Sequence, residues 1–120
     1  MGNPIISFER EFQVWSYSIG HGKLLLRSGK SHKHATRIDV LFTDVRSIET
    51  RMTIETLSIE EEEATKIKNH NVQPVQTMEK GHKVFLIKSR TWIGCIVAGA
   101  VRWHEDQGEF GQPSALLIDK

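Results

Sequence analysis

The histidine pair in His32-Lys33-His34 has the spacing that most favours metal chemistry in this 120-residue chain. In an extended backbone, side chains two residues apart project to the same side, so both imidazoles could reach one metal ion. A complete site needs further ligands, and the candidates are His21, His104, Glu105 and Asp106. A divalent metal at His32, His34 and His104 is therefore one hypothesis. Solvated histidines in a Ser-, Lys- and Gly-rich loop are the more frequent explanation, because the ligand spacing of known zinc motifs is absent.

A basic stretch at residues 21–37 holds five lysines and arginines and no acidic residue. Turns flanked by glycine and rich in cations bind anions such as phosphate. The candidate ligand-binding residues in this stretch are His21, Lys23, Arg27 and Arg37. No Gly-x-x-x-x-Gly-Lys-Ser motif supports a nucleotide. Arg37 and Asp39 also share one face of a predicted strand, and a pair between them would account for Arg37 without a ligand.

Three other candidates have simpler structural explanations. His104 precedes Glu105, but adjacent residues on a strand point to opposite faces, which argues against their cooperation as a general base. Cys95 lies in the most apolar segment, which predicts a core thiol and not a nucleophile. The glutamates at 60–63 are explained by the dipole of a predicted helix, without calcium. No catalytic residue is assigned, so an enzyme is the less favoured class.

Composition limits the class of protein further. One domain covering residues 1–120 is expected from the length, with 38% hydrophobic and 26% charged residues. The net charge of +1 argues against a nucleic-acid-binding protein. The single cysteine fits a reducing compartment, and neither a secretory signal nor an apolar run long enough to span a membrane is seen. We therefore expect a cytoplasmic protein with no nucleic-acid or membrane partner.

Hydrophobic alternation and β-branched residues predict a mostly antiparallel β structure. Strands are expected at residues 12–19, 24–27, 37–42, 45–50, 51–57, 83–87, 91–103 and 116–118. Gly20 and Gly22 predict a tight hairpin turn, and Gly94 and Gly99 predict bulges or close backbone approach within a strand. The Ser58–Glu61 capping box predicts one helix at 59–69. The expected fold class is α+β, a mostly antiparallel sheet of about six to eight strands in a barrel-like or sandwich form with one short helix.

Two segments carry resemblances to known proteins. The pattern Val14-Trp15-x-Tyr17, His21-Gly22-x-Leu24-Leu25-Leu26-Arg27-Ser28 and then Thr36 to Phe42 resembles a family of small bacterial proteins of uncharacterised activity. That resemblance implies a bacterial protein and brings no functional residue with it. Asp44-Val45-Arg46-Ser47-Ile48-Glu49 resembles the first strands of pleckstrin-like sheets, although the C-terminal helix of those sheets is missing here. Shared fold patterns of this kind do not establish function.

These observations favour a non-catalytic binding or interaction module of a bacterial cytoplasmic protein. It would act through a protein partner or by self-association, for example as a homodimer through an edge strand. The aromatics of the predicted strands, Trp15, Trp92 and Trp103, are expected to contribute. The alternative is a small metal-dependent or ligand-binding protein that uses His21, His32, His34 and His104. An anion or nucleic-acid contact through residues 23–37 is a third hypothesis, and no cofactor other than a divalent metal is expected.

Overall fold

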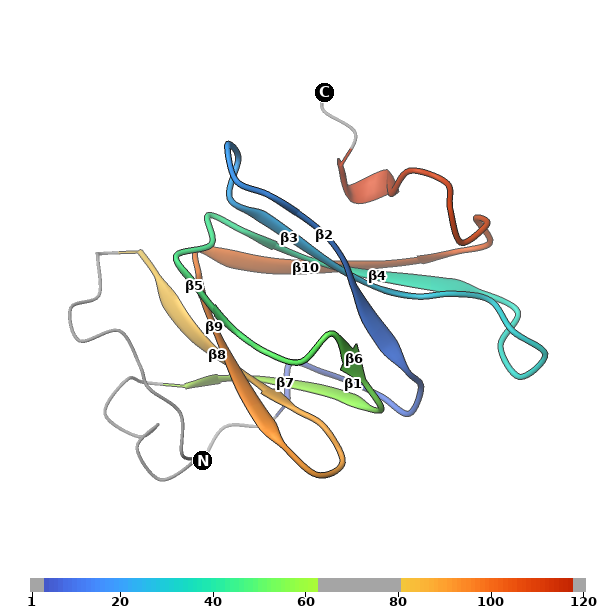
Figure 1. Ribbon diagram of the computed structural model, residues 1–120, viewed down its shortest axis with the longest axis horizontal. Coiled ribbons are helices and arrows are strands. Elements are labelled where there is room, and N and C mark those ends of the chain that lie inside the picture. Colours follow the sequence, from blue (N-terminus) through green and yellow to red (C-terminus); the bar gives the residue numbers. More distant parts are fainter. Residues whose placement is uncertain (1–3, 63–80, 118–120) are drawn as a thin grey trace.

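Two antiparallel sheets of five strands each form a sandwich in the computed structural model, which describes residues 4–62 and 81–117 (Figure 1). The first sheet has the strand order β1 (Ile6–Phe8), β7 (Leu57–Glu62), β8 (Lys83–Lys88), β9 (Ile93–Ala98) and β5 (Ser47–Glu49). The second has the order β10 (Ala100–Asp106), β4 (Arg37–Thr43), β3 (Lys23–Ser28), β2 (Phe12–Ser18) and β6 (Thr53–Ile54). The only helical turn in the described residues is the short 3-10 helix η2 (Ala115–Leu117).

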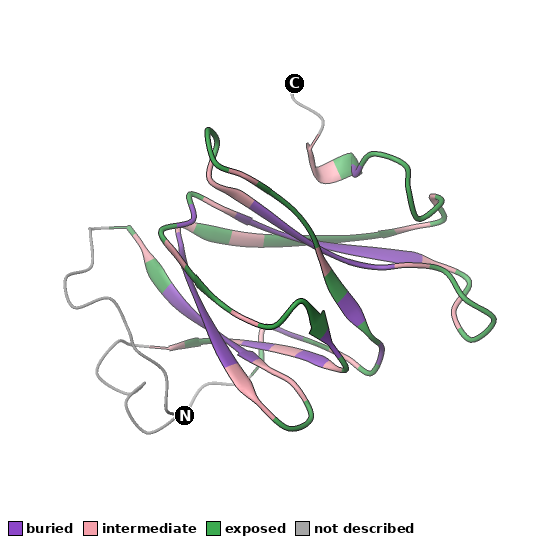
Figure 2. Cartoon of the chain, in the orientation of Figure 1, coloured by how far each residue is buried: buried purple, intermediate pink, exposed green. Residues whose placement is uncertain are grey.

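The core lies between the two sheets because alternate residues of the central strands point inward. Figure 2 shows buried positions running along β3, β4, β8 and β9. The inward side chains of these strands include Leu24, Leu26, Ile38, Val40, Phe42, Phe85, Ile87 and Ile96. The rings of Phe42 and Phe85 meet across the sandwich with centroids 5.6 Å apart. Burial of this apolar surface is the main term that stabilises the fold.

Gly99 marks the point where the chain passes from the first sheet into the second. It separates β9 from β10, and its N–H donates to the carbonyl of Thr43 at 2.9 Å. The predicted strand at 91–103 is therefore two strands joined at this glycine. A Cβ atom at Gly94 would meet the carbonyl oxygen of Glu49 well inside van der Waals contact. The prediction of close backbone approach is confirmed at Gly94, whereas Gly99 marks a break between two strands and not a bulge within one.

Most strand predictions are confirmed, but the helix prediction at 59–69 is wrong where it can be checked. Ser58, Ile59 and the first glutamates lie in β7, and residues 63–69 fall outside the described residues. Leu57 and Ile59 are buried on the core side, and β7 pairs with β8 along five residue pairs. Core burial and a full ladder of backbone hydrogen bonds outweigh a local capping signal, since propensity is a weak prior. The described residues thus support a β-sandwich and not the α+β label.

The C-terminal prediction also needs correction. Residues 115–117 form η2 and not the start of a strand at 116–118. Here Ser114 Oγ accepts a hydrogen bond from the N–H of Leu116 at 3.1 Å, which favours a helical turn. Within residues 4–62 and 81–117, no helix has the length and apolar character needed to cross a bilayer.

We predict that Gly94→Ala destabilises the protein by about 1–3 kcal/mol, because the added methyl group must displace the backbone of residues 49–50. The matched control is Gly20→Ala, where nothing lies within 4 Å of the added atom. Urea denaturation of both variants measures the free energy of unfolding. Equal stability of the two variants would contradict the packing described at Gly94.

Candidate functional site

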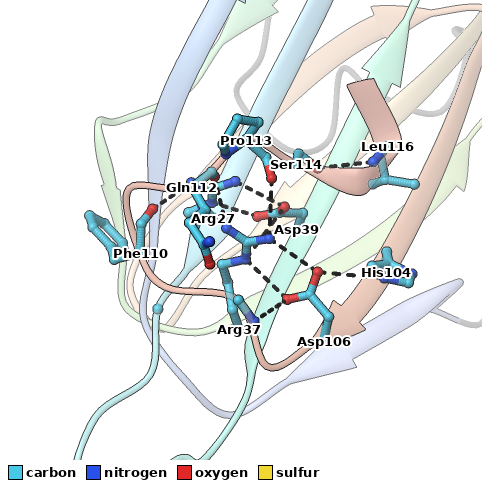
Figure 3. Close-up of polar contacts among 12 residues, drawn as sticks. Arg27, Arg37, Asp39, His104, Asp106, Phe110, Gln112, Pro113, Ser114 and Leu116 are labelled. Atoms are coloured by element: carbon cyan, nitrogen blue, oxygen red, sulfur yellow. Dashed lines mark hydrogen bonds and ion pairs between the residues drawn. The ribbon is translucent and has the colours of Figure 1, made fainter. Parts of the chain in front are cut away.

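A ladder of alternating arginine and aspartate side chains crosses the outer face of the second sheet (Figure 3). Arg27 on β3 lies opposite Asp39 on β4, and Arg37 on β4 lies opposite Asp106 on β10. Opposite residues of antiparallel strands project to the same side, so each pair can form a two-point hydrogen bond. Arg27 donates through Nε and Nη2 to the Asp39 oxygens at 2.7 and 3.1 Å. Arg37 donates through Nε and Nη2 to the Asp106 oxygens at 3.1 Å each.

Three members of this ladder are almost fully removed from water. Arg27 and Asp39 are each 1% exposed and Arg37 is 3% exposed. Buried charges are tolerated only when their donors and acceptors are satisfied. The remaining guanidinium donors find backbone carbonyls in residues 107–117, which we call the C-terminal segment. Arg27 Nη1 donates to Phe110 at 2.5 Å, and Arg37 Nη1 donates to Glu109 at 2.7 Å and to Gln112 at 2.8 Å.

Asp106 is the last side chain of the ladder, and its neighbours set the pKa of its carboxyl group. The hydrogen bonds from Arg37 hold the pKa of the Asp106 carboxyl below its usual value, with help from the N–H of Gly108 at 3.0 Å. The same pair raises the pKa of Arg37, against the opposing effect of burial. His104 Nε2 lies 3.5 Å from the second Asp106 oxygen. The Asp106 carboxylate is therefore stabilised in its charged form.

Aromatic packing fixes the C-terminal segment at its centre. The rings of Trp15 and Phe110 meet edge to face with centroids 4.5 Å apart, and the guanidinium carbon of Arg27 lies 5.1 Å from the Trp15 centroid. Gly29 lies directly beneath the Phe110 ring, and a Cβ atom there would clash with it. The absence of a side chain at Gly29 thus leaves the space that the Phe110 ring occupies.

An open cleft of about 620 Å³ lies beside the ladder, near the ends of β2 and β3. One part of its lining is basic, from the loop after β3, and the other is acidic, from the turns before β2 and before β7. The basic residues are Lys30, His32, Lys33 and His34, and the acidic residues are Glu9, Glu11 and Glu55. Arg27, Gln13 and Phe110 also line it, so the cleft borders the ladder directly.

Arg10 holds the loop that forms the basic wall. Its Nε donates to Ser28 Oγ at 2.8 Å, and its Nη2 donates to the carbonyls of Gly29 at 3.1 Å and Thr36 at 2.6 Å. These acceptors stand at the two ends of the loop, so one guanidinium joins them. Burial lowers the pKa of Arg10, although the Glu105 carboxylate opposes this effect. The loop is thereby fixed at both ends while its central residues remain exposed.

The predicted metal ligands are only partly brought together. His32 and His34 both line the cleft, and the backbones of Ser31 and His34 are joined by hydrogen bonds of 2.8 and 3.1 Å. His104 lies on β10 beside Asp106 and does not line the cleft. Across the described part of the chain, no group of three or more His, Cys, Asp or Glu side chains is placed to hold a metal ion. The geometry therefore gives no complete metal site there.

The four predicted anion ligands lie in different environments. His21 is at the tip of the β2–β3 hairpin, where its Nδ1 is 3.1 Å from Ser18 Oγ. Lys23 begins β3, at the opposite end of that strand from the cleft. Arg27 lines the cleft, but its guanidinium is bound to Asp39 and Phe110. Arg37 is buried beneath the C-terminal segment. These side chains do not converge on one ligand.

Several residues that build the site were not assigned to it from the sequence. Arg10 and Phe110 received no role, and Asp106 was considered only as a metal ligand or as a carboxylate beside His104. One signal was available, because Arg27 follows three leucines and Arg37 and Asp39 flank Ile38 inside apolar strands. Charges at alternating positions of such strands indicate a buried network on the second face. Nothing local in the sequence identifies Arg10, whose acceptors lie 18 or more residues away.

Comparisons of the chain with protein-family models, with curated proteins and with solved structures found no match. The class of protein is therefore defined by its fold and site: an antiparallel β-sandwich with a mixed-charge cleft beside a buried ion-pair ladder.

We predict that Asp39→Ala lowers the free energy of unfolding by about 3–5 kcal/mol, because it leaves Arg27 buried without its carboxylate. The control is Glu109→Ala, which removes an exposed partner of Lys30 and is expected to cost less than about 1 kcal/mol. Chemical denaturation of both variants provides the comparison. Similar losses in the two variants would show that the buried pair is not the stronger constraint.

The lowered pKa of Asp106 predicts acid sensitivity. Its folded-state value lies below the ordinary 3.8, so its contribution to stability is present above that pH and is lost as pH falls through the folded value. The wild type should lose stability on acidification more steeply than Asp106→Asn, which cannot titrate at this position. Glu9→Gln, which removes an exposed carboxylate, should keep the wild-type slope. Urea unfolding across a pH series tests this, and identical slopes for Asp106→Asn and the wild type would refute it.

Proposed function

We propose that the protein is a non-catalytic binding module whose cleft accommodates a segment of a protein partner. The observation that carries this proposal is the composition of the lining, with cations on the loop after β3 and carboxylates on the turns before β2 and before β7. A polypeptide segment that carries charges of both signs is complementary to such a lining. A simple anion is less well matched, because Glu9, Glu11 and Glu55 would repel it.

The exposed loop side chains support a binding role. Within the described residues, the side chains of His32 and Lys33 make no hydrogen bond or ion pair, and both are exposed. Their loop is nevertheless fixed at its ends by Arg10. A fixed backbone with uncommitted polar side chains lowers the ordering cost of binding. The cleft is thus suited to recognise a partner without large rearrangement.

The hydroxyl groups in the cleft support a non-catalytic assignment. Ser28 Oγ accepts a hydrogen bond from Arg10 and is buried. Ser31 Oγ accepts from the N–H of Lys33 at 3.2 Å. A nucleophilic serine needs a general base within hydrogen-bond reach, and neither hydroxyl is hydrogen-bonded to a histidine in the described structure.

A cytoplasmic setting is part of the same proposal. Cys95 is buried, and burial, with a smaller effect from Glu49, raises the pKa of its thiol to about 11. A thiol of that kind is unreactive. One buried thiol in a chain that can form no internal disulfide is compatible with a reducing compartment.

We predict that peptides selected from a displayed library on the wild-type protein bind Lys33→Glu about tenfold more weakly or worse. The substitution reverses one exposed charge of the basic wall. Arg90→Glu makes the same change of net charge on an exposed loop residue outside the cleft lining, and should bind like the wild type. Isothermal titration calorimetry gives the affinities.

Two outcomes would overturn the proposed function. Peptides that bind the wild type and Lys33→Glu equally would place the interaction outside the cleft. A native mass spectrum showing a stoichiometric metal that is lost in His32→Ala and His34→Ala would favour the metal-dependent alternative instead.

A further inference from the structure

Strand β10 is an unusual edge among the described strands. The other three edge strands, β1, β5 and β6, contain three, three and two residues, whereas β10 contains seven. Proteins normally protect long sheet edges with a proline, a bulge or a covering element, because unpaired backbone groups invite another strand. β10 has no proline, and its ladder with β4 runs through seven consecutive pairs without a register shift. The neighbouring element η2 contacts β10, with a hydrogen bond from Arg102 to Leu116, but it adds no strand to this edge.

The side chains of β10 are largely exposed. Trp103 is 44% exposed, and its ring packs against no other aromatic ring in the described residues. Ala100, Arg102, His104 and Glu105 are exposed as well. Arg102 has one long hydrogen bond, from Nη2 to the carbonyl of Leu116 at 3.4 Å. The strand therefore presents a backbone edge together with side chains that have capacity for further contacts.

We infer that β10 is a self-association edge, on which a second copy of this chain pairs antiparallel about a two-fold axis at His104. Such pairing joins the second sheets of two molecules into one continuous sheet, in the manner of β-strand addition. The interface lies on a different edge from the cleft, because β4 and β3 separate β10 from the cleft residues of β2 and β3. Self-association and the proposed binding function are therefore independent.

Charge complementarity selects this register. With His104 opposite its own copy, Arg102 of each molecule lies opposite Asp106 of the other, and this ion pair occurs twice. Trp103 of each molecule then lies opposite Glu105 of the other. Asp106, whose side chain is 27% exposed, accepts two hydrogen bonds from Arg37 and one from Gly108, and His104 Nε2 lies 3.5 Å from its second oxygen. Arg102 of the second copy would therefore interact with Asp106 mainly through the attraction of opposite charges.

Neighbouring registers satisfy the charges less well. The two-fold axis is perpendicular to the sheet, so residues that lie opposite each other must project from the same face. Neighbouring registers therefore shift one strand by two residues along the other, which moves the axis by one residue. Centring the axis on Trp103 places Arg102 opposite His104 and Val101 opposite Glu105. Centring it on Arg102 places two arginines in direct opposition, which is unfavourable. Of the three, only the arrangement centred on His104 opposes cations with carboxylates.

Single cysteines placed along β10 test both the edge and the register. Residues opposite each other across antiparallel strands have Cα separations compatible with a disulfide. His104→Cys should therefore oxidise to a covalent dimer under mild conditions, whereas Trp103→Cys and the exposed-loop control Arg90→Cys should remain monomeric on non-reducing gels. The native Cys95 is buried and does not compete. Circular dichroism confirms that each variant is folded.

A charge reversal provides an independent measurement on the otherwise unmodified chain. In the proposed register, Arg102→Glu places a carboxylate of each molecule opposite Asp106 of the other. The dissociation constant of the dimer, measured by sedimentation equilibrium, should therefore rise roughly tenfold or more. Arg90→Glu carries the same charge change and should dimerise like the wild type.

Three results would overturn the inference. A wild type that stays monomeric at every soluble concentration would remove the self-association edge. A wild-type dimer in which His104→Cys does not crosslink would place the interface elsewhere, and preferential crosslinking of Trp103→Cys would refute the register. None of these results bears on peptide binding in the cleft, so failure here is distinguishable from failure of the proposed function.

Discussion

The buried pair between Arg27 and Asp39 is the constraint on which the rest of the second sheet depends. Both groups are withdrawn from water, and their attraction alone does not offset the cost of that withdrawal. The third donor of Arg27 must therefore find an acceptor, and it is the carbonyl of Phe110. The same requirement at Arg37 recruits Asp106 and the carbonyls of Glu109 and Gln112. The path of the C-terminal segment across the sheet follows from satisfying two buried guanidinium groups.

The cleft follows from the same constraint. Once the Phe110 carbonyl is fixed over Arg27, its ring is fixed against Trp15 and above Gly29, and it becomes part of the cleft lining. The loop after β3 is fixed separately by Arg10, which joins Ser28 to Thr36. Two buried arginines thus position two sides of the cleft: Arg27 through Phe110, and Arg10 through the loop after β3. The exposed residues between them set the charge of the cleft and can be substituted without disturbing the core.

Much of the sheet architecture could be predicted from the sequence, because the alternation in β4, the short apolar runs in β3 and β8, and the glycines at 20, 22 and 99 are local signals. The prediction failed at β7, where Ser58 and Glu61 imitate a helix cap but pairing with β8 decides the conformation. For the site, sequence reasoning found the basic loop and proposed Arg27 and Arg37 as anion ligands, with a pair between Arg37 and Asp39 as the alternative. The structure places Arg37 Nε 4.0 Å from Asp39 Oδ2. The partners of Arg10 and Phe110 lie far away in the chain, so their roles follow from topology and not from local pattern.

Charged residues in β-strands have three different physical meanings in this molecule, and only position in the sheet separates them. Asp39 is on a central strand and its charge is buried and paired, so it contributes to the fold. Glu60 and Lys88 are diagonal neighbours on the paired strands β7 and β8, with Oε2 and Nζ 3.1 Å apart and partly exposed, and such a pair contributes little stability. Arg102 and Glu105 are on an exposed edge, where charges discourage pairing with most other strands. The same residue types therefore stabilise the fold on a central strand, contribute little to stability on a partly exposed strand, and restrict strand pairing on an exposed edge.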